Sequence, residues 1–339
     1  MQALVLAAGG VTGALYEVGV LRAVEERVGP LRQVFDLFLG VSAGATVSAF
    51  VSQGVTAGAL YEALLDGSDP LFPLRQEHLA ALDLRRGARV AAMALQQLSR
   101  AVGRLLPGDP SRSSHGHSLS GLFSTNSYER FLSTTLEANG LSNDFRRIPR
   151  RLLVPATDLD STNRVVFGMS SWSDTPVSRA VAASSAIPGF FDPVAIGDRT
   201  YIDGNVGDVA NLDVVLAEGA RRVLVISPMV PVENVDGSCV VPGEGPSCKS
   251  LAERGPWAVF NQALRIEHRR RLRQEIGRYT AEEPQLEVQL FEPEPSDATL
   301  FLANPMSLVA RREVLELAYD QTKRLLCRPE GAGWLCGTP

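Results

Sequence analysis

Short apolar runs alternate with stretches of helical periodicity along much of the chain. Residues 2–8 are apolar after Gln2, residues 35–39 are apolar apart from Asp36, and each run leads through glycines into apolar positions spaced three or four apart. Such runs predict buried strands, and the spacing predicts helices at residues 13–28 and from Ser42 onward. Further strands are predicted at residues 152–156, 164–167 and 223–227, and a further helix at 178–187, ended by Pro188 and Gly189. This alternation predicts an α/β fold in which a mostly parallel sheet is covered on both faces.

Two stretches interrupt the alternating pattern. Residues 66–126 are broken by proline and glycine at the start, helical in the middle and polar at the end, which predicts a helical insertion. Residues 230–256 have no periodicity and predict a long loop. The very basic helix predicted at residues 265–279 is interpreted as a solvated face. The sequence has no internal repeat, and residues 1–339 are expected to form a single domain. The long loop and the basic helical region, at about 230–280, are expected to be its second insertion.

Composition narrows the class of protein. The 339 residues are 45% hydrophobic and 21% charged, which is ordinary for a globular chain, and the net charge of −5 argues against a nucleic-acid partner. No apolar run approaches the roughly 20 residues of a membrane span. The first apolar run also lacks the basic segment that precedes the apolar core of a signal peptide. A cytoplasmic location is therefore expected.

The four cysteines fall late in the chain as two pairs. Cys239 and Cys248 form one pair, and Cys327 and Cys336 form the other. Metal sites usually combine closer spacing with histidines, which these segments lack, so no metal site is predicted. Free thiols are the favoured interpretation, and a loop-closing disulfide in an oxidising compartment is the alternative.

A serine flanked by glycines stands between the second predicted strand and the helix that follows it. Residues 40–44 read Gly-Val-Ser-Ala-Gly, a GxSxG pattern in which Gly40 and Gly44 let the backbone turn tightly around Ser42. The N-terminus of the next helix favours negative charge developing at the Ser42 hydroxyl. This context predicts a nucleophile for acyl transfer.

The first predicted strand ends in another glycine turn. Gly9, Gly10 and Val11 precede the helix and Gly13 begins it, in a region where backbone N–H groups have no intrahelical partner and can bind an oxyanion. A dinucleotide-binding turn requires G-x-G-x-x-G, and Ala8 stands where its first glycine would be. An oxyanion loop is therefore the favoured interpretation.

A serine nucleophile also needs a base within hydrogen-bond reach. None of the four histidines, at positions 78, 115, 117 and 268, ends a predicted core strand, so a Ser-His-Asp triad is not expected. Asp203 follows an apolar-aromatic strand and precedes Gly204, which permits a sharp turn into a cleft. The local pattern is equally compatible with a catalytic carboxylate and with an ordinary Asp-Gly turn.

Four segments in a fixed order resemble the patatin-like phospholipases. They are the glycine loop at residues 9–13, the GxSxG pattern at 40–44, the stretch ASSAIPGFFDPV at 183–194 and the stretch YIDGN at 201–205. The stretch VPATDLDSTNRVVF at 154–167 also fits the family. The resemblance covers about residues 2–58 and 150–228, and the ordered set is more specific than any one motif.

The resemblance implies a three-layer α/β/α sandwich with a Ser-Asp dyad. Mapped by motif, Ser42 is the nucleophile and Asp203 its base. Gly9 and Gly10, with Val11, then supply the oxyanion hole. The implied reaction is hydrolysis of an acyl-ester lipid, such as a phospholipid or lysophospholipid, through an acyl-enzyme and with no metal or cofactor.

Three positions depart from the family pattern. Ala8 replaces the first glycine of the loop, Thr12 replaces its usual basic residue, and Asn205 replaces the last residue of a DGG or DGA motif. Ala8 keeps its backbone N–H, so the oxyanion hole is expected to persist. The change at Thr12 leaves the head group of the substrate open.

Two other functions share some of these features. Acyl-carrier-protein transacylases have the same fold, but they place a histidine where Val41 stands and use a distant catalytic histidine. A lipid-binding pseudoenzyme would carry a damaged dyad or oxyanion loop, and neither is damaged beyond Ala8 and Asn205.

A membrane contact is one interpretation of the helix predicted between Arg85 and Leu106. Arg85, Arg89 and Arg100 fall on one arc of this helix, and Leu98 lies on the opposite, apolar arc. This arrangement is typical of an interfacial helix, but also of any surface helix in an arginine-rich protein, and the ordinary surface helix is the favoured interpretation.

Overall fold

The computed structural model describes residues 1–79, 121–234, 239–241, 244–248, 250–302, 306–327 and 333–336. The helix predicted between Arg85 and Leu106 lies outside these residues, as do the histidines at positions 115 and 117.

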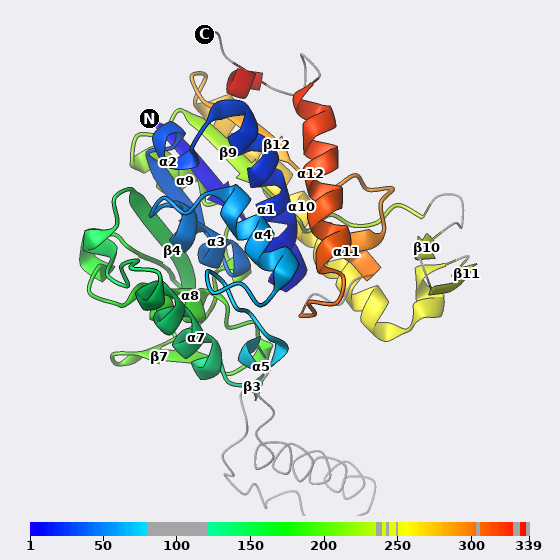
Figure 1. The fold of residues 1–339 in the computed structure, drawn as a ribbon, viewed down its shortest axis with the longest axis horizontal. Coiled ribbons are helices and arrows are strands. Elements are labelled where there is room, and N and C mark those ends of the chain that lie inside the picture. The colour runs from blue at the N-terminus through cyan, green and yellow to red at the C-terminus, as the bar shows by residue number, and fades with distance from the viewer. Residues whose placement is uncertain are drawn as a thin grey trace, which may run out of the picture.

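A mostly parallel sheet runs through the centre of the molecule (Figure 1). In the described part of the chain it has eight strands in the order β12-β9-β1-β2-β4-β8-β7, with β5 beside β4. The strands are β1 (Gln2–Leu6), β2 (Leu37–Gly40), β4 (Arg151–Asp158), β5 (Arg164–Phe167), β7 (Val194–Ile196), β8 (Arg199–Asp203), β9 (Arg222–Ile226) and β12 (Glu287–Phe291). The five strands from β12 to β4 are parallel, whereas β5, β8 and β7 join by antiparallel pairing.

Helices cover both faces of this sheet. Successive side chains of a strand point to opposite faces, so alternate residues of each strand are buried in two separate helix layers. Leu4 and Leu6 of β1 belong to one core cluster, and Ala3 and Val5 belong to a second. The first cluster is completed by α1 (Gly10–Val28), α3 (Ala43–Val51), α4 (Ala57–Asp66), α7 (Asn126–Ala138), α8 (Val177–Ser184) and α12 (Arg311–Leu326). The second is completed by α9 (Leu212–Ala217) and α10 (Pro256–Glu282). The expected three-layer α/β/α sandwich is confirmed.

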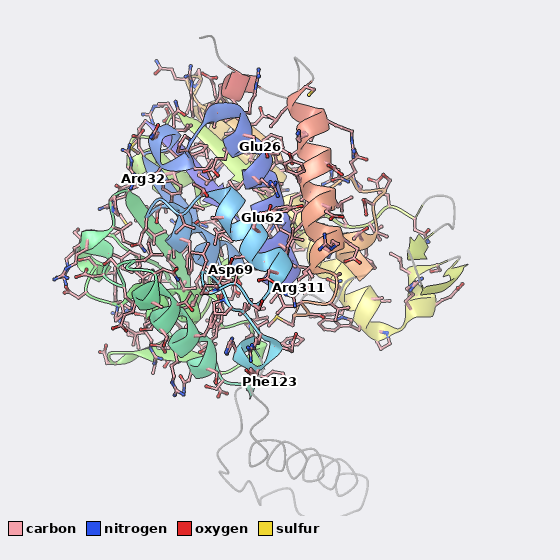
Figure 2. All side chains as sticks on the ribbon, viewed as in Figure 1. Glu26, Arg32, Glu62, Asp69, Phe123 and Arg311 are labelled. Atoms are coloured by element: carbon pink, nitrogen blue, oxygen red, sulfur yellow. The ribbon has the colours of Figure 1, made fainter. Side chains whose placement is uncertain are left out.

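The helix layer of the first cluster is held together by close packing and by polar contacts. Gly19 of α1 lies against the backbone of Leu315 on α12, where a side chain would collide. At the surface, the Tyr319 hydroxyl of α12 donates to Glu26 of α1, which is labelled in Figure 2. These contacts fix α1, whose N-terminal end forms part of the site described below.

The remaining elements are short. They are α2 (Leu31–Val34), α5 (Gln76–Leu79), α11 (Thr299–Leu302), a pair of strands β3 (Gly121–Phe123) and β6 (Gly189–Phe191), and a pair β10 (Cys239–Val241) and β11 (Glu244–Cys248). Part of the segment predicted as a loop therefore forms a two-stranded ribbon, in which the backbone of Cys239 lies opposite that of Cys248. Cys327 is an exposed free thiol. The structure does not describe the side chains of Cys239, Cys248 and Cys336.

Three sequence-based expectations need correction. The first helix begins at Gly10 rather than Gly13, and the helix before Pro188 ends at Ser184. The basic helix is not a solvated face throughout, because Arg265 and His268 of α10 are buried. Among the described residues, no helix is both long enough and apolar enough to cross a bilayer.

Candidate active site

The turn at Ser42 is forced by the close approach of backbone to backbone. Ser42 has φ 56° and ψ −121°, a conformation that L-residues rarely adopt, at the junction of β2 and α3. A Cβ at Gly40 would overlap the backbone of Gly44 and Ala45, and a Cβ at Gly44 would overlap the carbonyl of Leu6. Both glycines of the GxSxG pattern are therefore required by packing.

The side chain of Ser184 also holds this turn. The backbone N–H of Ser42 donates to Ser184 Oγ at 2.9 Å, in a fully buried contact between α3 and the end of α8. Ser184 lies in the stretch ASSAIPGFFDPV, but the sequence offered no sign of its partner.

Asp203 ends strand β8 and lies against Ser42. A Cβ at Gly204 would overlap the carbonyl of Pro155 and approach the side chain of Val41, so the turn after Asp203 packs directly on the Ser42 turn. The Asp203 carboxylate accepts a hydrogen bond from the Asn205 backbone N–H at 2.8 Å. It also interacts with the Ser42 side chain.

Burial raises the pKa of Asp203 to about 6, against the opposing effect of its hydrogen bonds from the Asn205 N–H and the Ser42 side chain. A carboxylate with this pKa is ionised at neutral pH and is still basic enough to accept a proton from a hydroxyl. Both side chains are almost completely buried, with 3% of Ser42 and 4% of Asp203 exposed.

The glycine loop lies on the other side of Ser42. Gly9 precedes α1, and Gly10, with φ 64°, begins it. Gly10 and Val11 line the same pocket as Ser42, whereas Gly9 and Gly13 face Pro228, which leaves no room for a side chain on Gly9. The N–H groups of the first turn of a helix have no intrahelical acceptor, so this loop can bind an anion beside Ser42.

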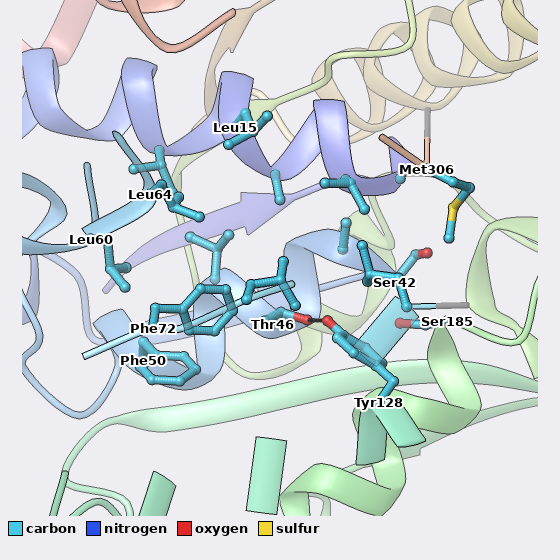
Figure 3. A pocket seen from close by; sticks show the side chains of 18 of the residues that line it. Leu15, Ser42, Thr46, Phe50, Leu60, Leu64, Phe72, Tyr128, Ser185 and Met306 are labelled. Atoms are coloured by element: carbon cyan, nitrogen blue, oxygen red, sulfur yellow. Dashed lines mark hydrogen bonds between the residues drawn. The ribbon is translucent and has the colours of Figure 1, made fainter. Parts of the chain in front are cut away.

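An almost entirely apolar pocket extends from Ser42 into the first core cluster (Figure 3). Ser42, Ser185 and Met306 lie at one end of the view, and Phe50, Leu60, Leu64 and Phe72 lie at the other. Between the two ends, the hydroxyls of Thr46 and Tyr128 are hydrogen-bonded to each other. Burial raises the pKa of Tyr128 to about 12, so this hydroxyl remains neutral.

One histidine lies near the site, but not as a base for Ser42. His268 of α10 is buried, and its ring nitrogens contact Asn205 Oδ1 at 3.0 Å and Ser227 Oγ at 3.1 Å. Burial, followed by the nearby guanidiniums of Arg271 and Arg265, lowers the pKa of His268 to about 3. His78 instead stacks on Phe131.

A metal site requires several ligand side chains close together. The described residues contain no group of three or more histidine, cysteine, aspartate and glutamate side chains that could hold a metal ion. What the structure does bring together is a serine in a strained backbone turn, a buried carboxylate, the N-terminus of helix α1 and an apolar pocket.

Comparison with known protein families agrees with the motifs. A sequence model described as patatin-like phospholipase matches residues 4–216. The chain therefore belongs to the patatin-like phospholipase family, as its motifs predicted. The match covers Ser42 and Asp203 and ends before α10.

Two curated relatives show limited identity. A protein named probable lipid hydrolase 463L, from Invertebrate iridescent virus 6, is 21% identical over 221 residues, which are 63% of this chain and 63% of the relative. The uncharacterized protein YqhO of Bacillus subtilis is 25% identical over 223 residues, which are 60% of this chain and 62% of the relative. The chain thus matches less than two thirds of the length of either relative.

Two bacterial proteins of known structure are also similar. VipD from Legionella pneumophila has 14% identity and a TM-score of 0.39, covering 96% of this chain and 66% of VipD. ExoU of Pseudomonas aeruginosa, in its complex with SpcU, has 17% identity and a TM-score of 0.40, covering 96% of this chain and 51% of ExoU.

Proposed function

We propose that this protein hydrolyses acyl-ester lipids, with Ser42 as nucleophile and Asp203 as its base. The observation that carries the proposal is a serine in a strained turn, in contact with a buried carboxylate, at the end of an apolar pocket. Family membership and the name of the viral relative, a probable lipid hydrolase, support the same class of reaction. Phospholipids and lysophospholipids are the first substrates to test.

In the proposed reaction, Ser42 Oγ adds to the ester carbonyl carbon while its proton moves to Asp203. The N–H groups of Gly10 and Val11 stabilise the oxyanion. When the tetrahedral intermediate collapses, the carbon–oxygen bond to the alcohol breaks and Asp203 returns the proton to the leaving oxygen. Water then attacks the acyl-enzyme and gives its proton to Asp203. Collapse of the second intermediate releases the fatty acid, and the proton returns to Ser42 Oγ.

The pocket supports an acyl chain as the bound group. Apolar side chains of α1, α3 and α4 form its walls, so each methylene that moves from water into the pocket contributes about 0.8 kcal/mol of binding free energy. We expect kcat/KM for a series of p-nitrophenyl esters to rise by up to about fourfold per methylene until the pocket is full. A kcat/KM that does not change with the length of the acyl chain would contradict binding of that chain in this pocket.

Covalent capture with an alkyl fluorophosphonate tests the proposed dyad. We expect the adduct on Ser42, mapped by mass spectrometry, and loss of labelling in Asp203→Asn. The rate of labelling should fall as the pH drops through about 6, because only the ionised Asp203 accepts the proton. A folded protein that hydrolyses no ester and leaves Ser42 unlabelled would overturn the proposal.

A further inference from the structure

Helix α10 lies outside the family match, yet its buried face consists largely of polar side chains that point at the active-site turns. Asn261, Arg265, His268 and Glu275 are all buried along this helix. Polar groups taken out of water are costly unless they are hydrogen-bonded, so each of them indicates a specific partner. The partners of His268 and Glu275 lie in the turn after Asp203 and in the loop after β9. Asn261 and Arg265 also bind carbonyls of α11, and Arg265 reaches the loop after β9 as well.

His268 binds the residue that sets the geometry of Asp203. The Asn205 side-chain oxygen can only accept, so His268 Nδ1 carries the proton and donates to it at 3.0 Å. His268 Nε2 then accepts from the Ser227 hydroxyl at 3.1 Å. The backbone N–H of the same Asn205 donates to the Asp203 carboxylate. A single residue thus connects the helix to the candidate base.

Two further side chains of α10 bind the rest of this loop. The Arg271 guanidinium donates to the carbonyls of Asn205 at 3.2 Å and Gly207 at 2.6 Å. The Glu275 carboxylate accepts from the backbone N–H groups of Ala210 at 3.0 Å and Leu212 at 2.8 Å. These bonds satisfy the polar backbone of a segment that has little regular structure of its own.

The same helix reaches the oxyanion loop through Pro228. Arg265 donates to the carbonyls of Val230 at 3.2 Å and Leu300 at 2.9 Å, and lies 3.4 Å from that of Pro228. The Pro228 ring packs where Gly9 and Gly13 have no side chain. Helix α10 therefore contacts elements on both sides of Ser42.

We propose that α10 is the positioning element of the active site, and that His268 acts on Asp203 through Asn205. The inference rests on the proposed role of Asp203 as the base. Asn205 is one of the positions that depart from the family pattern, and in the fold its side chain is hydrogen-bonded to His268. His268 is a positioning residue, since it touches Asn205 rather than the reacting atoms.

Two readouts on the full chain test this proposal. The first is hydrogen–deuterium exchange of residues 203–212, which does not depend on activity. The second is kcat and its acid limb with a soluble p-nitrophenyl ester. The variants are His268→Ala, Asn205→Ala, their combination, and the rescue variants His268→Asn and His268→Gln. Arg270→Ala is the control, because Arg270 lies on the exposed side of the same helix and binds only Glu267 among the described residues.

We expect His268→Ala to speed exchange of residues 203–212 and to lower kcat by about tenfold to a hundredfold with little change in KM. Its acid limb should move to higher pH, because a displaced Asn205 N–H no longer lowers the pKa of Asp203. His268→Asn keeps a donor near the Nδ1 position and should restore kcat. His268→Gln keeps a polar group near the Nε2 position, which faces Ser227, and should not restore kcat. The double variant should be no worse than the single ones.

The proposal is overturned if His268→Ala matches Arg270→Ala in both exchange and kcat, or if the effects of His268→Ala and Asn205→Ala add. If His268→Ala does not fold, Asn205→Ala removes the same bond from the loop side. Failure of the proposed function would look different. In that case the wild-type protein has no esterase activity and Ser42 is not captured, while the exchange data still decide whether α10 holds the loop.

Discussion

The two turns that meet in the proposed active site are stabilised in different ways. The Ser42 turn is held by backbone packed on backbone, because Gly40 and Gly44 leave no room for a Cβ. The Asp203 turn is held chiefly by hydrogen bonds to side chains of α10, more than 60 residues further along the chain. Backbone packing thus dominates at the Ser42 turn. Polar partners from a distant helix dominate at the Asp203 turn, where Gly204 also packs on the Pro155 carbonyl.

This difference has consequences for how each turn tolerates change. A steric turn cannot relax when a methyl group is added, so substitution there affects the fold as a whole. A turn held by several hydrogen bonds loses them one at a time, so single substitutions should alter geometry and catalysis before they unfold the protein.

The largest effect is expected for Gly44→Ala. Its Cβ would overlap the Leu6 carbonyl in the central strand β1, and neither backbone segment can move without disturbing the sheet. The free energy of unfolding should fall by on the order of 4 kcal/mol, as measured by urea denaturation. Gly58→Ala in α4 is the matched control, because nothing lies within 4 Å of its added Cβ. The free energy of unfolding of Gly58→Ala should rise by up to about 1 kcal/mol. Equal stability of the two variants would contradict the steric account.

The Ser42 turn could be predicted from sequence because the two glycines that permit it stand beside Ser42 in the chain, although the Leu6 carbonyl that Gly44 meets lies in β1. Apolar runs located β1, β2 and β9 to within about two residues, and the glycines around Ser42 indicated the tight turn. The two ends of the sheet were missed. Strand β12 carries polar residues at alternate positions, and β7 has three residues, so neither produces an apolar run.

The polar support of the other turn could not be predicted in this way. The buried face of α10 carries Arg265, His268 and Glu275, and hydrophobic periodicity does not register buried polar residues. Charged residues at helical spacing are usually solvated, so the sequence predicted the exposed side of this helix and missed its buried side. The apolar pocket likewise depends on how α1, α3, α4 and α7 pack together.

A smaller change in the free energy of unfolding than that of Gly44→Ala, and of opposite sign, is expected for Asp203→Asn. Burial raises the pKa of Asp203 from 3.8 to about 6, so the folded state disfavours the ionised carboxylate. This penalty is absent below pH 3.8 and complete above about pH 6. The variant should lose activity but gain on the order of 3 kcal/mol of unfolding free energy at pH 8, and little at pH 4.

Urea denaturation at the two pH values measures this gain, with the exposed Asp160→Asn as the control. If Asp203→Asn were equally stabilising at pH 4 and pH 8, the buried charge would not be its cause. A gain confined to high pH would show that the Asp203 turn holds its carboxylate at a cost to stability.

The smallest effect is expected for Ser184→Ala, which removes the side-chain oxygen that accepts a hydrogen bond from the Ser42 backbone N–H. The buried Ser42 N–H then has no acceptor, so the free energy of unfolding should fall by about 1–2 kcal/mol. The neighbouring Ser185→Ala is the control for stability, because Ser185 Oγ is buried without a hydrogen-bond partner in the described part of the chain. That variant should be neutral or stabilising. If Ser184→Ala instead destabilised the protein as much as Gly44→Ala, the Ser42 turn would depend on a polar partner as the Asp203 turn does, and the contrast between the two turns would fail.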